Sequence, residues 1–227
     1  MRLKNLILGD MKFQYKYGFY AVYLILVILY SCILFALPEG WREKAADIMI
    51  LTDPAAMGLF FMGAILMLEK SQRVINSIAV SPVETWEYII SKAVSISIIS
   101  VLVALVLSLI SGKSNVFGTL TGTFLGSIIF TMLGLWIAMK VKTLNSFMVC
   151  TVPIEIIFFV PAILYLFGIQ SKWMLLLPAC AIMHMYMGYD SYFFLCLLIC
   201  VIWSTLILYL VNKTFAKVVR NMGGMKL

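Results

Sequence analysis

Glu155 is the one carboxylate that lies deep within a long apolar run of the sequence, Phe147–Phe167. If that run crosses a membrane, a charge at this depth costs on the order of 3 kcal/mol, so the side chain must be neutral, paired or in contact with water. Pro153 and Pro161 flank it and free backbone carbonyls for other partners. We interpret Glu155 as a substrate-facing or gating group that attracts cationic amphiphiles, with a structural hydrogen bond to a neighbouring helix as the alternative.

A second cluster of chemically active residues is Met183–Met187, where three methionines surround His184, the only histidine of the chain. Sulfur and imidazole ligands suit Cu(I). Methionine is equally an adaptable apolar residue, however, and the chain holds 15 of them. We therefore expect core packing in this segment and no metal site.

Gly112–Ser114 mimics the end of a phosphate-binding loop, but Leu107 stands where that motif requires a glycine, and no strand precedes it. The sequence also lacks G-x-S-x-G, H-E-x-x-H and the paired intramembrane aspartates that a membrane protease would need. The chain is therefore predicted to be no enzyme and to hold no cofactor itself.

The composition shows which elements must position these residues. Of the 227 residues, 63% are hydrophobic and 12% are charged, whereas a soluble domain is nearer half apolar and a quarter charged. This excess of apolar residues excludes a disordered chain, a secreted disulfide scaffold and a water-soluble enzyme. Most of the five cysteines lie inside apolar runs and none forms a C-x-x-C pair, so they indicate neither a metal nor a disulfide.

Six apolar runs predict an all-α polytopic membrane protein with a transmembrane domain over residues 19–211 and a basic tail over 212–227. One of the six runs, Pro54–Leu68, is shorter than the others. Asp53 stands before it as an N-cap, with Pro54 at the first helical position, and Ala45–Thr52 could extend the run. Each of the other runs can cross about 30 Å of hydrocarbon at about 1.5 Å per residue. These runs are Phe19–Leu37, Ala93–Ser111, Val116–Met139, Phe147–Phe167 and Tyr192–Val211.

The distribution of charge predicts the topology. With six spans and a cytoplasmic N-terminus, 13 of the 17 basic residues fall inside, and the outer four are Arg42, Lys44, Lys113 and Lys172. A seventh span at Trp173–Tyr189 would move the basic C-terminus outside, against the positive-inside rule. We therefore predict a re-entrant or interfacial element at residues 173–189 on the outer face. The net charge of +7 then reflects topology and contact with anionic membrane lipids, and no nucleic acid is needed to explain it.

The first segment, Met1–Gly18, predicts a basic amphipathic helix. Leu3, Ile7, Met11 and Tyr15 recur at helical spacing, with basic residues mostly on the opposite face. Such a helix lies along the membrane surface, here on the cytoplasmic side.

The sequence of the inner loop over residues 69–92 predicts helical structure that a simple connector would not need. Ser81 is placed to cap a helix that begins at Pro82, and Glu84 then falls at the third helical position, close to a capping box. Two short helices joined at this capped break would make a firm cytoplasmic projection. A solvated connector is the alternative.

A glycine stripe follows one face of the fourth span. Gly118, Gly122, Gly126 and Gly134 stand at multiples of four residues, which lets another helix approach closely. We favour packing within the subunit over a dimer or pathway surface.

The loop pattern, with the six-span layout, resembles the membrane subunit of ABC-2-type transporters. The resemblance rests on the charged end of the second span and on Arg73, Ser81, Pro82, Val83, Tyr88 and Lys92. The N-terminal helix and the half-inserted outer segment fit that fold too. The segments most similar to the fluoroquinolone-export permease branch are LILGDMKFQYKYGFY and DPAAMGLFFMGAILMLEKSQRVINSIAVSPVE.

This resemblance implies an export permease of amphipathic drugs in a prokaryotic plasma membrane, assembled as a homodimer or as a heterodimer with a similar permease. A separate cytoplasmic ABC ATPase would hold the ATP and Mg²⁺ and would dock on the N-terminal helix and the inner loop. In the loop, the implied docking residues are Arg73, Ser81, Pro82, Val83 and Glu84. The alternatives are a lantibiotic or peptide permease of the same fold, a non-transport scaffold or immunity protein, and a channel.

Overall fold

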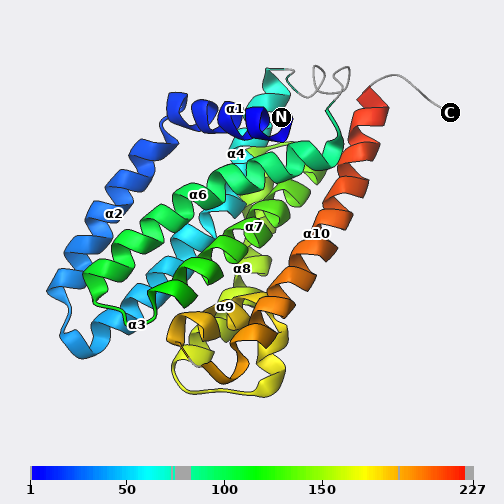
Figure 1. The fold of residues 1–227 in the computed structure, drawn as a ribbon. Coiled ribbons are helices and arrows are strands. Elements are labelled where there is room, and N and C mark those ends of the chain that lie inside the picture. The colour runs from blue at the N-terminus through cyan, green and yellow to red at the C-terminus, as the bar shows by residue number, and fades with distance from the viewer. Residues whose placement is uncertain (1, 73, 75–82, 189, 223–227) are drawn as a thin grey trace.

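Six helical segments are long and apolar enough to cross a membrane, and this confirms the predicted all-α polytopic class (Figure 1). The computed structural model describes residues 2–72, 74, 83–188 and 190–222, and these contain helices and turns but no strand. The crossing helices are α2 (Phe19–Ala36), α3 with η1 and α4 (together Glu39–Ser71), α6 (Thr85–Ser111), α7 (Val116–Lys140), α8 (Leu144–Leu166) and α10 (Phe193–Met222).

The second span differs from its prediction. Asp53 and Pro54 do not begin a helix, because α3 (Glu39–Ile50) runs through the π-helical turn η1 (Leu51–Ala55) into α4 (Met57–Ser71). Proline has no N–H to donate to the preceding turn, and a wider π turn accommodates that loss without ending the helix. The crossing segment is therefore longer than the apolar run that begins at Pro54.

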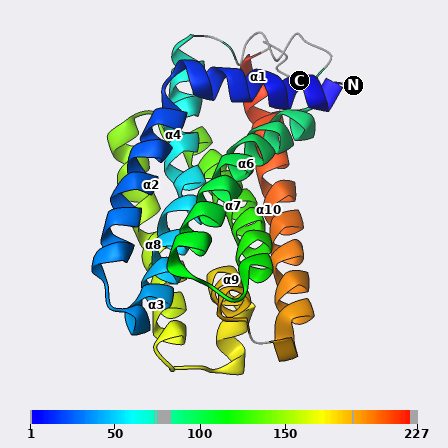
Figure 2. The same ribbon diagram turned by 60° about the vertical axis from the view of Figure 1, so that its left-hand side comes forward.

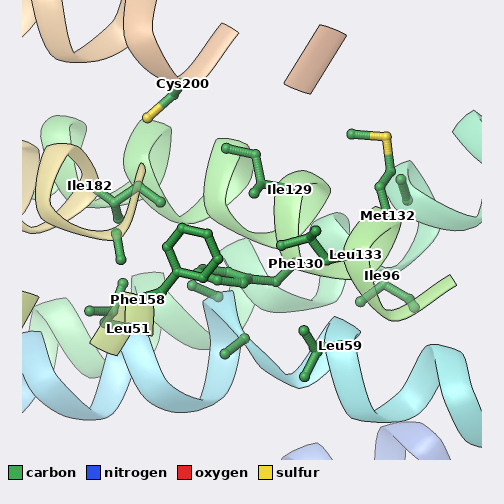
Figure 3. Close-up of a cluster of buried hydrophobic side chains, with 14 of the residues drawn as sticks. Leu51, Leu59, Ile96, Ile129, Phe130, Met132, Leu133, Phe158, Ile182 and Cys200 are labelled. Carbon is green, nitrogen blue, oxygen red and sulfur yellow. The ribbon is translucent and has the colours of Figure 1, made fainter. Parts of the chain in front are cut away.

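Helix α7 forms the centre of the bundle. In the most apolar stretch of α7, 78% of the residues are buried, against 11% in that of α2 and 22% in that of α8. Figure 3 shows the core around Phe130 of α7, with Leu59 of α4, Phe158 of α8 and Ile182 of α9 around it. The ring centroids of Phe130 and Phe158 are 6.1 Å apart in an edge-to-face arrangement. The poorly buried α2 and α8 present apolar side chains outward, as lipid-facing helices do.

Two elements lie at opposite ends of the bundle. Helix α1 (Arg2–Lys16) runs across the end where α4 and α10 finish and α6 begins (Figures 1 and 2). Helix α9 (Pro178–Met187) lies at the other end, beside the turn that joins α6 to α7 (Figure 2). We refer to these as the α1 end and the α9 end.

The segment at residues 173–189 does not form a seventh span among the described residues. A short 3₁₀ helix, η2 (Lys172–Leu176), leads to Pro178, which begins α9. Ten residues of helix cover about 15 Å, roughly half of the hydrocarbon thickness. Every residue from Pro178 to Tyr186 is buried, and Gly188 ends the helix with φ of 75°. The short turn η3 (Asp190–Tyr192) then leads into α10.

Candidate functional site

At the α1 end, Lys92 joins three helices through two buried ion pairs. Its Nζ atom lies 2.9 Å from Oδ1 of Asp10 on α1 and 2.6 Å from Oε1 of Glu69 on α4. The side chains of Lys92 and Glu69 are 4% and 6% exposed, and that of Asp10 is 16% exposed. The two ends of the loop over residues 69–92 are thereby held together, and α1 is fixed to both.

Hydroxyl groups complete this network, which we call the Lys92 network (Asp10, Glu69, Tyr88, Ser91 and Lys92). The Tyr88 hydroxyl donates to Glu69, and the Ser91 hydroxyl donates to Oδ2 of Asp10 at 2.7 Å. Lys92 Nζ also lies 4.7 Å from the centroid of the Tyr88 ring. A buried charge is tolerated when it is both paired and hydrogen-bonded, and each charge here meets both conditions.

A second contact sets the register of α1 on α6. One turn beyond Asp10, the side-chain amide of Gln14 donates to Oγ of Ser95 at 2.8 Å. Asp10 and Gln14 are four residues apart, as are their partners Ser91 and Ser95. Residues at this spacing share one face of a helix, so two successive turns of α1 match two successive turns of α6.

Helix α10 also contacts α6 at the α1 end. The ring of Phe215 stacks on that of Tyr88, with centroids 4.8 Å apart and an angle of 10° between the planes. The hydroxyl of Thr85 donates to the side-chain oxygen of Asn212. The α1 end therefore brings together α1, α4, α6 and the C-terminal part of α10.

The predicted docking residues are placed only in part. Arg73, Ser81 and Pro82 lie outside the described residues. Val83 is half-buried and Glu84 is exposed, just before α6.

The predicted place of Glu84 at the third helical position is wrong. Glu84 has an extended backbone (φ −74°, ψ 149°), and α6 begins at Thr85. The N–H of Glu84 donates to Oε2 of Glu87 at 3.0 Å. Glu84 is therefore the N-cap rather than the third helical residue, and Glu87 takes the place that Glu84 was predicted to fill.

The buried face of α1 also differs from the predicted one. Leu3, Ile7 and Met11 are half-buried, but Tyr15 is 75% exposed while Gln14 is only 2% exposed. Sequence reasoning missed Asp10 and Gln14 because polar residues of an amphipathic helix are normally assigned to water.

Glu155 lies half-buried in the middle of α8, which continues through Pro153 and Pro161. Its Oε1 atom is buried and accepts no hydrogen bond from the described residues. The adjacent Ile156 and Ile157 are each 57% exposed, so this part of α8 lies at the periphery of the bundle.

The glycine stripe contacts two helices of the same chain. Gly118, Gly122 and Gly126 face α9, and a Cβ atom at Gly122 would lie 2.9 Å from the Tyr186 ring. Gly134 faces the backbone of α4. Larger residues at these positions would separate α7 from α9 and α4.

At the α9 end, Lys113 forms a buried ion pair with Asp47 of α3. Its Nζ lies 5.2 Å from the centroid of the Tyr186 ring, and the Tyr186 hydroxyl is 2.9 Å from Oγ1 of Thr123. Lys113, which the charge count placed among the four outer basic residues, is only 9% exposed. Gly112, directly before it, ends α6 with φ of 70°.

His184 is buried on α9, and its Nδ1 atom lies 2.8 Å from the Tyr165 hydroxyl. Across the part of the chain that the structure describes, no group of three or more His, Cys, Asp or Glu residues could hold a metal ion.

Comparison with known proteins identifies the family. A model of the Fluoroquinolones export permease protein family matches residues 1–219. The chain belongs to this family. The match covers α1 and most of α10, so both buried ion networks lie within the part of the chain that carries the family pattern.

Two curated relatives carry the same family name. Both are proteins of Mycobacterium tuberculosis described as fluoroquinolones export permease proteins, and each is 25% identical to this chain over 141 residues. The alignment covers 61% of this chain and 60% of each relative, so it spans about three fifths of the relatives' length. Together with the six crossing helices, the family membership makes this chain a multi-pass membrane protein.

Proposed function

We propose that the chain is the membrane-spanning subunit of an ATP-driven exporter, which moves amphipathic drugs out across the prokaryotic plasma membrane. ATP and Mg²⁺ would belong to a separate cytoplasmic ABC ATPase. The observation that carries the proposal is the family match over residues 1–219, in a chain whose transverse helix is fixed to the crossing helices.

The Lys92 network supplies a mechanical route for coupling. An ATPase that docks on α1 and on the loop over residues 69–92 would push on segments that Lys92 ties together. Helices α4 and α6 both pack against the central α7, so a shift at the α1 end reaches the core of the bundle. Closure of the ATPase pair on ATP would then move the permease between inward-closed and outward-open states.

The distribution of charge supports an orientation with the α1 end in the cytoplasm. Arg2, Lys4, Lys12 and Lys16 are exposed on α1, and positive charge is retained on the cytoplasmic side of membrane proteins. The positive charges of these residues would also attract anionic membrane lipids. The pathway itself would form between two copies of the chain, or between this chain and a similar permease.

The test is transport by the assembled complex. The ABC ATPase that co-purifies with the chain would be reconstituted with it in liposomes, and efflux of a fluoroquinolone and of a cationic peptide would be measured with and without ATP. The control is an ATPase variant that lacks its P-loop lysine.

Each outcome separates the alternatives. ATP-dependent drug efflux supports the proposal, and ATP-dependent movement of the peptide alone assigns the chain to peptide export. Flux that is indifferent to ATP indicates a channel, and the absence of both an ATPase partner and transport indicates a scaffold or immunity protein.

A further inference from the structure

A cavity of about 350 Å³ opens where α1 turns into α2, at a junction over residues 17–18 that we call the elbow. Four of its lining residues share one face of α1, and Tyr20 comes from the first turn of α2. The four are Leu8, Met11, Lys12 and Tyr15. The residues of α1 that bind α6, Asp10 and Gln14, lie on another face, so this cavity is separate from the Lys92 network.

Three of the five lining side chains can donate hydrogen bonds. Lys12 is exposed, and it forms no ion pair within the described part of the chain. The rings of Tyr15 and Tyr20 meet edge to face with centroids 6.0 Å apart, and Tyr15 is 75% exposed. An ammonium group beside phenol hydroxyls suits a phosphate group, because hydrogen bonds to an ionised acceptor are stronger than those between neutral groups.

An apolar surface continues from the cavity along α2. Leu24 and Ile28 follow Tyr20 at intervals of four residues, so all three lie on one face of the helix. Leu24 is 64% exposed and Ile28 is 57% exposed. The rise from Tyr20 to Ile28 is about 12 Å, close to the depth of one leaflet, which is about 15 Å of hydrocarbon. The surface is therefore long enough for most of an extended acyl chain.

We propose that the elbow binds one anionic phospholipid from the leaflet at the α1 end. Its phosphate meets Lys12, Tyr15 and Tyr20, and one acyl chain runs along Leu24 and Ile28. Helix α1 lies across the end of the bundle and α2 leads away from it (Figure 2), so the two helices meet the headgroup and the chain in that order. The lipid covers the helix with the smallest buried share of the six candidate spans.

This inference goes beyond a general attraction of the basic α1 for anionic lipids, because it assigns one lipid to one place. It concerns the membrane-crossing chain itself and does not depend on transport. The anionic lipids of the cytoplasmic leaflet supply the required charge if the α1 end is cytoplasmic.

Retention of lipid by the full chain in detergent tests the site. The intact protein would be weighed by native mass spectrometry after incubation with dioleoylphosphatidylglycerol. One lipid should remain bound to each chain, and Lys12→Gln should weaken its binding about tenfold, since this change removes the cation that meets the phosphate. Dioleoylphosphatidylcholine, which has no net charge, should bind weakly. Dihexanoylphosphatidylglycerol should also bind weakly, because its short chains cannot cover the surface of α2.

Lys4→Gln provides the matched control, because Lys4 is an exposed lysine of the same helix outside the cavity. Equal losses in Lys4→Gln and Lys12→Gln would overturn the proposal and leave only a diffuse attraction between α1 and anionic lipids. Equal retention of the phosphatidylglycerol and the phosphatidylcholine would also overturn it. Displacement of the long-chain lipid by glycerol phosphate would show that the cavity recognises a free phosphate, and this too would contradict a lipid site.

Discussion

The Nζ atom of Lys92 lies 2.6 Å from Oε1 of Glu69, so the first and last residues of the loop over residues 69–92 are in direct contact. A loop closed by a buried ion pair moves as a unit with α4 and α6. Whatever conformation its middle adopts, a force on it reaches both helices at the same point.

Lys92→Met should lower the free energy of unfolding by about 3–5 kcal/mol, because it leaves two carboxylates without their cation. Thermal unfolding in detergent would measure the loss. Adding Asp10→Asn and Glu69→Gln to the same protein should restore much of the stability, since no charge is then left unpaired. Lys142→Met is the control on an exposed lysine. An unchanged unfolding temperature in Lys92→Met would contradict the network.

Asp10→Asn should loosen α1 while the spans stay folded, because Lys92 keeps Glu69 as a partner. Amide hydrogen exchange in α1 should become roughly tenfold faster, with little change in α7. Lys12→Asn places the same side chain at an exposed position of the same helix and should have no such effect. Equal protection of α1 in wild type and Asp10→Asn would show that the ion pair does not hold α1.

Gly134→Ala and Gly9→Ala should have opposite effects on stability. A Cβ atom at Gly134 would lie 2.8 Å from the Cα atom of Leu59, and this backbone cannot swing away as a side chain could. At Gly9, on exposed α1, nothing lies within 4 Å, so alanine should stabilise the helix by about 0.5–1 kcal/mol. Thermal unfolding of the two variants compares them directly, and a tolerated Gly134→Ala would contradict the close approach of α7 and α4.

Single cysteines test the orientation of the bundle. In a cysteine-free background, a membrane-impermeant maleimide should label Glu43→Cys in intact cells and Lys142→Cys only after permeabilisation. Both positions are exposed and lie at opposite ends. Labelling of position 142 from outside would invert the topology. Lys113 is unsuitable as a reporter because it is buried.

Glu155→Gln should weaken export of cationic compounds while sparing neutral ones, if the carboxylate contacts the pathway. If Glu155 has a structural role, Glu155→Gln should leave export of every substrate unchanged, and Glu155→Ala should reduce the amount of folded protein. Resistance to one cationic and one neutral drug, with protein levels measured in parallel, decides between them. Equal loss for both drugs at normal protein level would indicate gating instead of charge recognition.

The membrane-crossing layout could be predicted from the sequence because it depends on local apolar content. Phe19–Ala36 and the absence of a seventh span between α8 and α10 follow from hydropathy and the positions of basic residues. The ion pairs could not be predicted in the same way. Asp10 and Lys92 are 82 residues apart, and their contact depends on how α1 lies across α6. The available signal was Asp10 itself, the one acidic residue in a basic helix.

Local rules also failed where packing decided the outcome. Asp53 and Pro54 match a helix start, yet the chain continues through them as a π turn because the segment is held between α3 and α4. The structure shows Glu84 as the N-cap of α6, with the acidic Glu87 as its partner three residues later. Sequence rules identify residues that can cap a helix, but they do not choose between candidates that stand a few residues apart.

The order of the paired residues along the chain has a consequence for biogenesis. Asp10, Asp47 and Glu69 are all synthesised before the lysines that neutralise them, Lys92 and Lys113. The second span therefore enters the bilayer with the carboxylates of Asp47 and Glu69 unmatched, and Asp10 on α1 also lacks its partner. The two lysines stand near the beginning and just beyond the end of α6, so insertion of this one helix neutralises both ends of the nascent bundle. A chain that ends before α6 holds all three carboxylates without the cations that bury with them in the folded bundle.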